Sequence, residues 1–197
     1  VTALQMARLF SVIANDGFLV QPRIVEAIRD HHGVKTPLEY APKVRVISSD
    51  TAVTMKAMLE RVVAVGTGRL AQVPGYRVAG KTGTAQMINP ITRSYKDGTY
   101  VASFCGFAPV NDPAIVGVVV LDAPQGKYYG GQIAAPVFPR VLQQALRYLD
   151  VAPGRAVERG TRPLPEVPEH LLADFVAEEP IDGPATDADG QILVALI

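Results

Sequence analysis

Apolar positions recur at helical spacing in three parts of the chain, near residues 3–14, 49–65 and 136–149. The first begins after Thr2, and Gln5 three positions later completes the pattern of a capping box. The third begins with a proline, which the first turn of a helix tolerates. These spacings predict three amphipathic helices that each bury one face.

Between the second and third helices the period changes to the alternation that is typical of strands. Segments 76–87, 100–108 and 114–121 each show it, and residues 110–113 read as a hairpin turn. Residues 118–121 are apolar on both faces, which predicts a covered central strand. The order helix, helix, three strands, helix predicts the α+β class, an antiparallel sheet with helices packed on it.

Two further segments differ from this core. Residues 18–28 are extended and apolar, and 29–43 are polar, which predicts a surface excursion with a hairpin turn at His32-Gly33. From residue 151 onward there are nine acidic and three basic residues, with frequent prolines. We therefore predict a folded part over 1–150 and an acidic, Pro-containing tail or linker over 151–197.

Composition excludes several classes of function. Nineteen basic and nineteen acidic residues cancel, so the charge balance does not indicate nucleic-acid binding. Cys105 is the only cysteine, which excludes an internal disulfide and a Cys-based zinc site. The histidines show no ligand spacing, and we predict neither a metal nor a cofactor. The chain begins at Val1 immediately before a helix cap, so we expect it to be a piece of a longer protein.

The stretch "GYRVAGKTGTAQ", residues 75–86, allows two interpretations. Residues 75–82 fit G-x-x-x-x-G-K-[ST], a loop that wraps nucleotide phosphates, and Asp122 after an apolar run resembles a magnesium-holding acid. A phosphate loop must however leave a strand and open a helix. A glycine, a β-branched threonine and then Pro90 make a poor helix, so the sequence context disfavours a phosphate site.

The second interpretation is a strand at the edge of a cleft. Alternation then places Lys81 and Gly83 on one face, and Thr82 and Thr84 on the other. Lys81 supplies positive charge, and the threonine hydroxyls can donate to a carboxylate. Gly83 lets a peptide backbone approach, and the Thr84 N–H is available to an oxyanion. For an isolated Lys-Thr-Gly, a plain hydroxyl-rich strand with a surface lysine remains the simpler interpretation.

The wider sequence resembles the transpeptidase domain of class B penicillin-binding proteins, with the cell-division type most similar. The stretches that carry the resemblance follow one another in the expected order. They are "VTALQMARLFSVIANDGFLVQPRIV" (1–25), "TAVTMKAMLERVVAVGTGRLAQVPGYRVAGKTGTAQ" (51–86), "YVASFCGFAPVNDPAIVGVVVLDAP" (100–124) and "YYGGQIAAPVF" (128–138). The resemblance covers residues 1 to about 150 and implies the C-terminal part of that domain.

The resemblance also implies roles for individual residues. Lys81 and Thr84 would be catalytic, with Lys81 supporting the serine chemistry and the Thr84 amide completing an oxyanion hole. The substrate-binding set would be Thr82, Gly83, Thr84, Tyr128, Tyr129 and Gly130. For the two tyrosines, a packed aromatic loop is an equally good interpretation. The ligands would be the D-Ala-D-Ala stem peptide and β-lactams.

The family's nucleophile is absent from these residues. The five serines, Ser11, Ser48, Ser49, Ser94 and Ser103, have neither Lys three positions on nor Asn two positions on. The S-x-x-K and S-x-N motifs are therefore expected upstream of Val1, and this chain alone is expected to be inactive.

The resemblance further implies an N-terminal anchor in the inner membrane with this domain in the periplasm. The expected partners are the N-terminal part of the same protein and proteins of cell-wall synthesis and division. Two alternatives stay open, a D,D-carboxypeptidase or β-lactamase-type serine hydrolase, and a non-catalytic β-lactam sensor.

Overall fold

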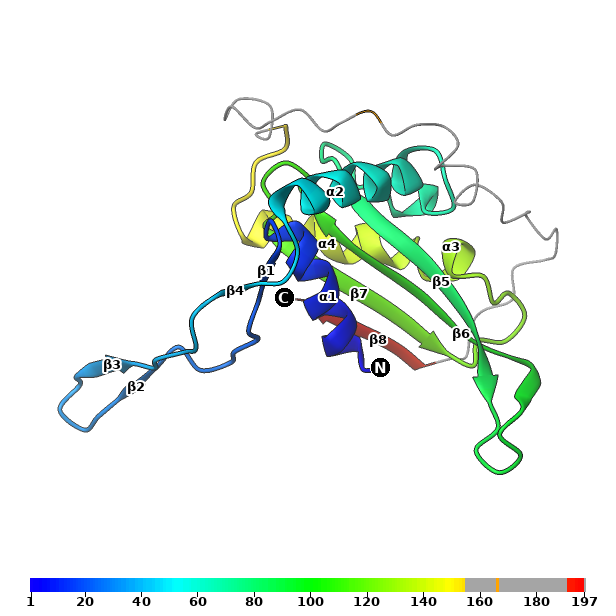
Figure 1. Ribbon diagram of the computed structural model, residues 1–197, viewed down its shortest axis with the longest axis horizontal. Coiled ribbons are helices and arrows are strands. Elements are labelled where there is room, and N and C mark those ends of the chain that lie inside the picture. Colours follow the sequence, from blue (N-terminus) through cyan, green and yellow to red (C-terminus); the bar gives the residue numbers. More distant parts are fainter. Residues whose placement is uncertain (155–165, 167–190, 197) are drawn as a thin grey trace.

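A computed structural model describes residues 1–154, 166 and 191–196 of the chain. Its centre is a four-stranded antiparallel sheet with the order β5-β6-β7-β8. The strands are β5 (Ala79–Ile88), β6 (Tyr95–Ala108), β7 (Ile115–Asp122) and β8 (Gln191–Leu196). Helices cover both faces of this sheet, so the predicted α+β class is confirmed (Figure 1).

The three predicted helices are present as α1 (Ala3–Ala14), α2 (Ser49–Ala64) and α4 (Val137–Tyr148). The capping box at the start of α1 is formed. The Thr2 hydroxyl accepts from the Gln5 amide at 3.2 Å, and the Gln5 side chain accepts from the Thr2 amide at 2.8 Å. These two bonds satisfy backbone donors that an uncapped helix would leave unpaired.

Two short helical elements were not predicted. The helix α3 (Gly130–Ile133) lies just before α4, and a single 3₁₀ turn, η1 (Arg69–Ala71), follows α2. Both contain too few residues to show a helical period in the sequence.

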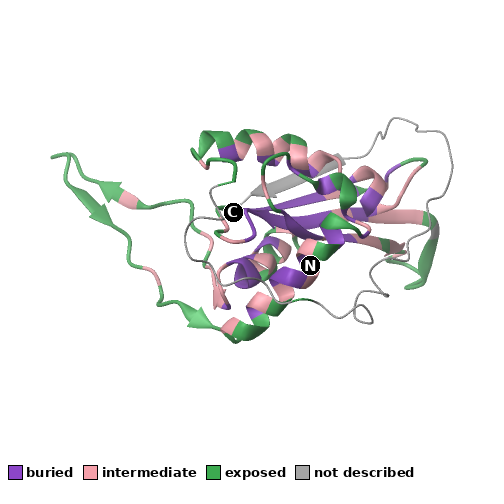
Figure 2. Cartoon of the chain, turned by 90° about the horizontal axis from the view of Figure 1, so that it is seen from above, coloured by how far each residue is buried: buried purple, intermediate pink, exposed green. Residues whose placement is uncertain are grey.

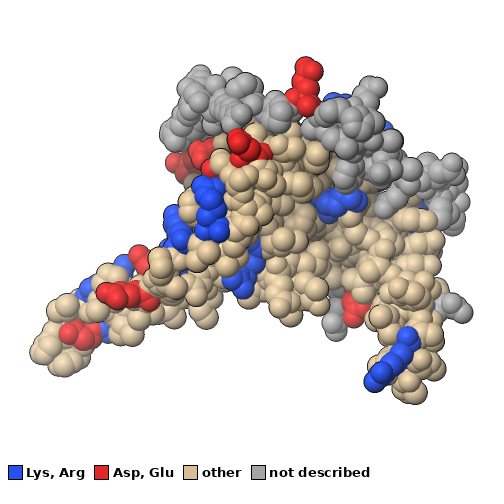
Figure 3. Space-filling model, in the orientation of Figure 1, with Lys and Arg blue, Asp and Glu red and all other residues tan. Residues whose placement is uncertain are grey.

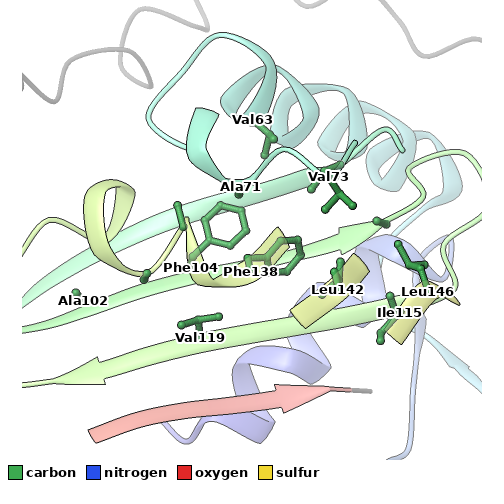
Figure 4. Packing of buried hydrophobic residues seen from close by; sticks show 14 of the residues in the cluster. Val63, Ala71, Val73, Ala102, Phe104, Ile115, Val119, Phe138, Leu142 and Leu146 are labelled. Atoms are coloured by element: carbon green, nitrogen blue, oxygen red, sulfur yellow. The ribbon is translucent and has the colours of Figure 1, made fainter. Parts of the chain in front are cut away.

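Each face of the sheet carries its own apolar cluster. Cross-strand partners point to the same face, so Thr82 of β5, Phe104 of β6 and Val119 of β7 share one face. Helix α4 covers that face, and the ring of Phe138 meets Phe104 edge to face at 4.8 Å (Figure 4). The opposite face, with Cys105, packs against α1 and part of α2. Buried residues therefore concentrate in the middle of the sheet (Figure 2).

The polar segment forms an arm, residues 20–43, that projects from the body (Figure 1). At its base β1 (Phe18–Leu19) pairs with β4 (Val44–Arg45), and farther out β2 (Ala27–Arg29) pairs with β3 (Lys35–Pro37). Gly33 turns this hairpin with φ +84°, as the sequence predicted. Lys, Arg, Asp and Glu side chains alternate along the arm, so neither sign of charge dominates it (Figure 3).

One charged side chain of α2 is buried near the base of the arm. Lys56 is 9% exposed, and burial lowers the pKa of its ammonium group. The carboxylates of Asp16 and Asp112 raise the same pKa, but by less than burial lowers it. The net direction means that the folded state disfavours the charged form of Lys56.

The strands extend beyond the predicted segments in two places. β6 begins at Tyr95 because a register shift between Gln86 and Ile88 lets the pairing with β5 continue past a bulge. Residues 191–196 of the predicted tail form β8, which pairs antiparallel with β7. Most of the rest of that tail lies outside the described residues, and the division at residue 150 stays a prediction.

Candidate active site

The Lys-Thr-Gly sequence lies in β5, an end strand of the sheet. Its backbone stays extended to Ile88, and no helix opens after Thr82, so the geometry that a phosphate loop needs is absent there. Among the described residues, β6 is the only strand that pairs with β5. The segment 79–88 is therefore the edge strand that the carboxylate interpretation requires.

The open edge of β5 is the edge that faces away from β6. The carbonyl oxygens of Gly83 and of its cross-strand partner Ser103 both lie 2.4 Å from the position of a Cβ at Gly130, so the Gly83 carbonyl points toward β6. The carbonyl of its neighbour Thr82 therefore points to the open edge, where Lys81 Nζ donates to it at 3.0 Å. Backbone groups of an antiparallel strand alternate in direction, so Thr84, two positions on, presents its N–H and C=O to the same edge. The Thr84 amide thus points away from β6 and toward the open edge.

The hydroxyls of Thr82 and Thr84 lie on the face of the sheet that carries Phe104, as alternation predicted. Thr82 Oγ1 lies 2.9 Å from the hydroxyl of Thr67 and 3.3 Å from Lys81 Nζ. Thr84 Oγ1 accepts from the Gly130 amide at 3.0 Å. Thr82 is 5% exposed, whereas Thr84 is only half-buried. Both hydroxyls are therefore held by contacts from outside β5.

Glycines allow the loop that carries Gly130 to rest directly on the strand. A Cβ at Gly130 would lie 2.4 Å from the carbonyl oxygens of both Gly83 and Ser103. We expected the missing side chain at Gly83 to leave room for a ligand backbone. A Cβ at Gly83 would lie 2.5 Å from Ser103 Oγ, so the Ser103 hydroxyl fills this space instead. Any side chain at position 130 would force the loop away from β5.

Three tyrosine rings stack next to this loop. Tyr100 and Tyr128 lie 4.1 Å apart, and Tyr128 and Tyr129 lie 4.6 Å apart, measured between ring centroids. A hydrogen bond to Tyr129 raises the pKa of Tyr128. Tyr100 is the cross-strand partner of Gln86, which puts it on the same face as Thr84. Tyr100 was not among the predicted site residues, because its place opposite Gln86 depends on the strand register, which the sequence alone does not give.

The residues around β5 carry chemical groups that can bind an anion. Lys81 brings a positive charge to the open edge, and the Thr84 amide and two hydroxyls lie on the same short stretch. Charge-assisted hydrogen bonds of this kind favour a carboxylate over a neutral group. The described part of the chain holds no cluster of His, Cys, Asp and Glu suited to a metal ion.

Other features of the molecule lie away from this site. Cys105 is 1% exposed, and burial raises the pKa of its thiol, so it is a packed apolar residue as predicted. A cavity of about 660 Å³ opens at the base of the arm, where Arg8, Leu19 and Asp112 are among its lining residues. None of the predicted site residues lines it. No helix within the described ranges is long and apolar enough to cross a membrane.

Comparisons with known proteins agree with this geometry. Residues 1–143 match the family described as the penicillin binding protein transpeptidase domain. Penicillin-binding protein PbpB of Mycolicibacterium smegmatis is 42% identical over 155 residues, which cover 74% of this chain and 24% of that protein. Peptidoglycan D,D-transpeptidase FtsI of Escherichia coli K12 is 36% identical over 155 residues, which cover 78% of this chain and 24% of FtsI.

Solved structures give the same result. Penicillin binding protein 3 of Mycobacterium tuberculosis, crystallised with aztreonam, superposes with a TM-score of 0.69 at 37% identity, covering 80% of this chain and 37% of that one. The chain spans about a quarter of the length of the curated relatives above. The family match covers most of the described body and includes β5, its open edge and the loop at Gly130. The chain therefore belongs to the penicillin-binding protein transpeptidase family, and its structural neighbours are class B members.

Proposed function

We propose that the protein containing this chain is a serine-type peptidoglycan D,D-transpeptidase, and that residues 1–150 form the wall of its active site that binds the substrate carboxylate. The observation that carries the proposal is that Lys81 Nζ contacts the carbonyl and the hydroxyl of Thr82 on an end strand, with the Thr84 hydroxyl on the same face as that of Thr82. A peptide added to this edge would gain backbone hydrogen bonds as well as a partner for its charged end.

In the proposed reaction each polar group of this site has a chemical role. A serine from outside these residues attacks the carbonyl between two D-alanines, and an ester forms while the terminal D-alanine leaves with a proton on its amine. The Thr84 N–H donates to the oxyanion of the tetrahedral intermediate, a contribution of roughly 10²–10³ in rate for one such donor. The Thr82 and Thr84 hydroxyls hold the terminal carboxylate, and Lys81 stabilises negative charge at the serine.

The second half of the reaction is the transfer of the acyl group. An amine of a neighbouring stem peptide attacks the ester, a new amide bond forms, and the serine recovers its proton. In a carboxypeptidase or β-lactamase water takes the place of the amine, and a sensor keeps the acyl group. The tyrosine stack next to Gly130 provides an apolar wall along which either peptide strand can lie.

The setting of this reaction is part of the proposal. Cross-linking acts on a polymer outside the cytoplasm, so the domain would face that side of the inner membrane, held by an anchor elsewhere in the protein. Proteins of cell-wall synthesis and division would be its partners.

Labelling with fluorescent penicillin tests this function. The polypeptide that contains this chain together with the S-x-x-K and S-x-N motifs should become covalently labelled, and Lys81→Met should reduce the labelling rate by at least about a hundredfold. Lys35→Met, which removes an exposed lysine on the arm, is the matched control and should label normally. Absence of labelling in the unmodified protein would contradict the proposal. Product analysis with an acceptor amine separates transfer from hydrolysis.

A further inference from the structure

Thr67 lies in a loop between Gly66 and Gly68, and these two glycines allow the loop to pack closely against the end of α2. The Gly68 amide donates to the Val62 carbonyl at 3.0 Å, and a Cβ at Gly66 would lie 3.0 Å from Val62 Cα. On its other side the loop touches the start of α3, because a Cβ at Gly131 would lie 2.5 Å from the Thr67 carbonyl oxygen. The position of Thr67 is thus fixed from two sides.

The Thr67 hydroxyl faces the hydroxyl of Thr82 at 2.9 Å, fifteen residues later in the chain. Lys81 Nζ lies 3.3 Å from the same Thr82 oxygen. A hydroxyl has one proton to donate and two lone pairs to accept with, whereas an ammonium group only donates. When both Lys81 and Thr67 donate, the acceptor capacity of Thr82 is filled, and its own proton is left for a ligand.

Burial strengthens this ordering. Because Thr82 is 5% exposed, water offers few alternative partners, and the neighbouring side chains decide the direction of its proton. The contact with Thr67 also favours one of the χ1 rotamers that a threonine side chain can adopt.

The same arrangement recurs at the neighbouring hydroxyl. Gly130 N–H donates to Thr84 Oγ1 at 3.0 Å, which uses an acceptor position and leaves the Thr84 proton for a ligand. Two adjacent hydroxyls that both donate suit an anion with two acceptor oxygens. They suit a neutral amide less well, because its N–H group finds no acceptor there.

We infer that Thr67 is a positioning residue for carboxylate recognition: it donates to Thr82 and so directs the Thr82 hydroxyl to donate to the ligand. This inference rests on the proposed function. It assigns to the Gly66-Thr67-Gly68 loop a role that differs from simple attachment of α2 to β5.

The test compares two forms of one penicillin, with a free carboxylate and as its methyl ester, on the complete polypeptide. Thr67→Val removes the hydroxyl at nearly constant volume, and Thr67→Ser keeps it. Acylation rates by the two penicillins are measured by mass spectrometry, together with the melting temperature of each variant. Thr36→Val, on the exposed arm, is the matched control.

Thr67→Val should acylate with the carboxylate form about tenfold more slowly, which is part of what one charge-assisted hydrogen bond contributes. Its rate with the ester should stay close to that of the unmodified protein, and Thr67→Ser should restore most of the carboxylate rate. If the valine variant does not fold, Thr67→Ala is used with the same comparison of rates.

Two results would overturn the inference while leaving the proposed function intact. One is an equal loss with both penicillins accompanied by a lower melting temperature, which would show that Thr67 only ties the loop to the strand. The other is a valine variant that keeps its preference for the carboxylate. If the unmodified protein reacts with neither penicillin, the proposed function itself fails, and the inference fails with it.

Discussion

Gly130→Ala adds one methyl group where the structure leaves no room for it. The new Cβ would lie 2.4 Å from two backbone oxygens, those of Gly83 and Ser103, and backbone atoms in a sheet cannot rotate away as a side chain can. The loop must therefore lift from β5. That movement also breaks the hydrogen bond from the Gly130 amide to Thr84 Oγ1, now 3.0 Å long.

Three contributions determine how much Gly130→Ala changes the free energy of unfolding. Overpacking costs about 1–3 kcal/mol, and the lost hydrogen bond costs about 1 kcal/mol. Alanine is the better helix former in α3, which offsets about 1 kcal/mol. The net loss is about 2 kcal/mol in unfolding free energy, which would lower the melting temperature of a domain of roughly 150–250 residues by about 4–8 °C and that of the longer complete polypeptide by less.

Thermal denaturation and penicillin acylation of the complete polypeptide measure the two consequences. Acylation should fall along with stability, because the lifted loop no longer orients the Thr84 hydroxyl. Gln132→Ala, two positions later in α3, is the control and should change neither quantity appreciably. A Gly130→Ala protein as stable and as reactive as the unmodified one would show that the close approach at 130 is not needed.

Three further predictions concern the packed body. Phe104→Ala should cost about 3–5 kcal/mol in denaturant unfolding, because the ring is fully buried, whereas Tyr148→Ala, 90% exposed in the unmodified protein, should change stability by less than about 0.5 kcal/mol. Burial lowers the pKa of Lys56 in the folded state below its ordinary value of 10.5. Below the folded-state pKa the side chain is charged in both states, so burying the charge lowers the free energy of unfolding by its full amount. As the pH rises from the folded-state pKa toward 10.5, the folded state releases the proton and this loss of stability disappears. Lys56→Met should therefore be at least as stable as the unmodified protein at pH 7, with the difference shrinking at pH 10; a less stable variant at pH 7 would refute this. Cys105 should react with a thiol reagent only after denaturation, and rapid reaction of the folded protein would contradict its burial.

The strand that carries the candidate site, β5, and the start of helix α1 could be predicted from the local sequence. The alternation around Gly83 predicted an extended strand, and the capping box predicted the start of α1; both are present. These features depend on neighbours within a few residues, where spacing and backbone preference act directly.

Contacts between distant segments could not be read in the same way. Thr67 meets Thr82 only because α2, its terminal loop and β5 pack together, and no periodicity reports that proximity. Strand β8 pairs with β7 across more than sixty intervening residues, in a segment whose composition indicated a tail. The short helix α3 could not be predicted because its first two residues are glycines, which have a low helix propensity. In the structure these glycines let the loop contact the backbone of neighbouring segments.

A crystal structure of the complete polypeptide acylated by a penicillin would test most directly whether the open edge of β5 binds the anionic end of a ligand. We expect the penicillin carboxylate within hydrogen-bonding distance of Thr82 Oγ1 and Thr84 Oγ1, and the acyl carbonyl oxygen within hydrogen-bonding distance of the Thr84 amide. A bound penicillin whose carboxylate lies away from this edge, with the Thr84 amide turned toward β6, would contradict it.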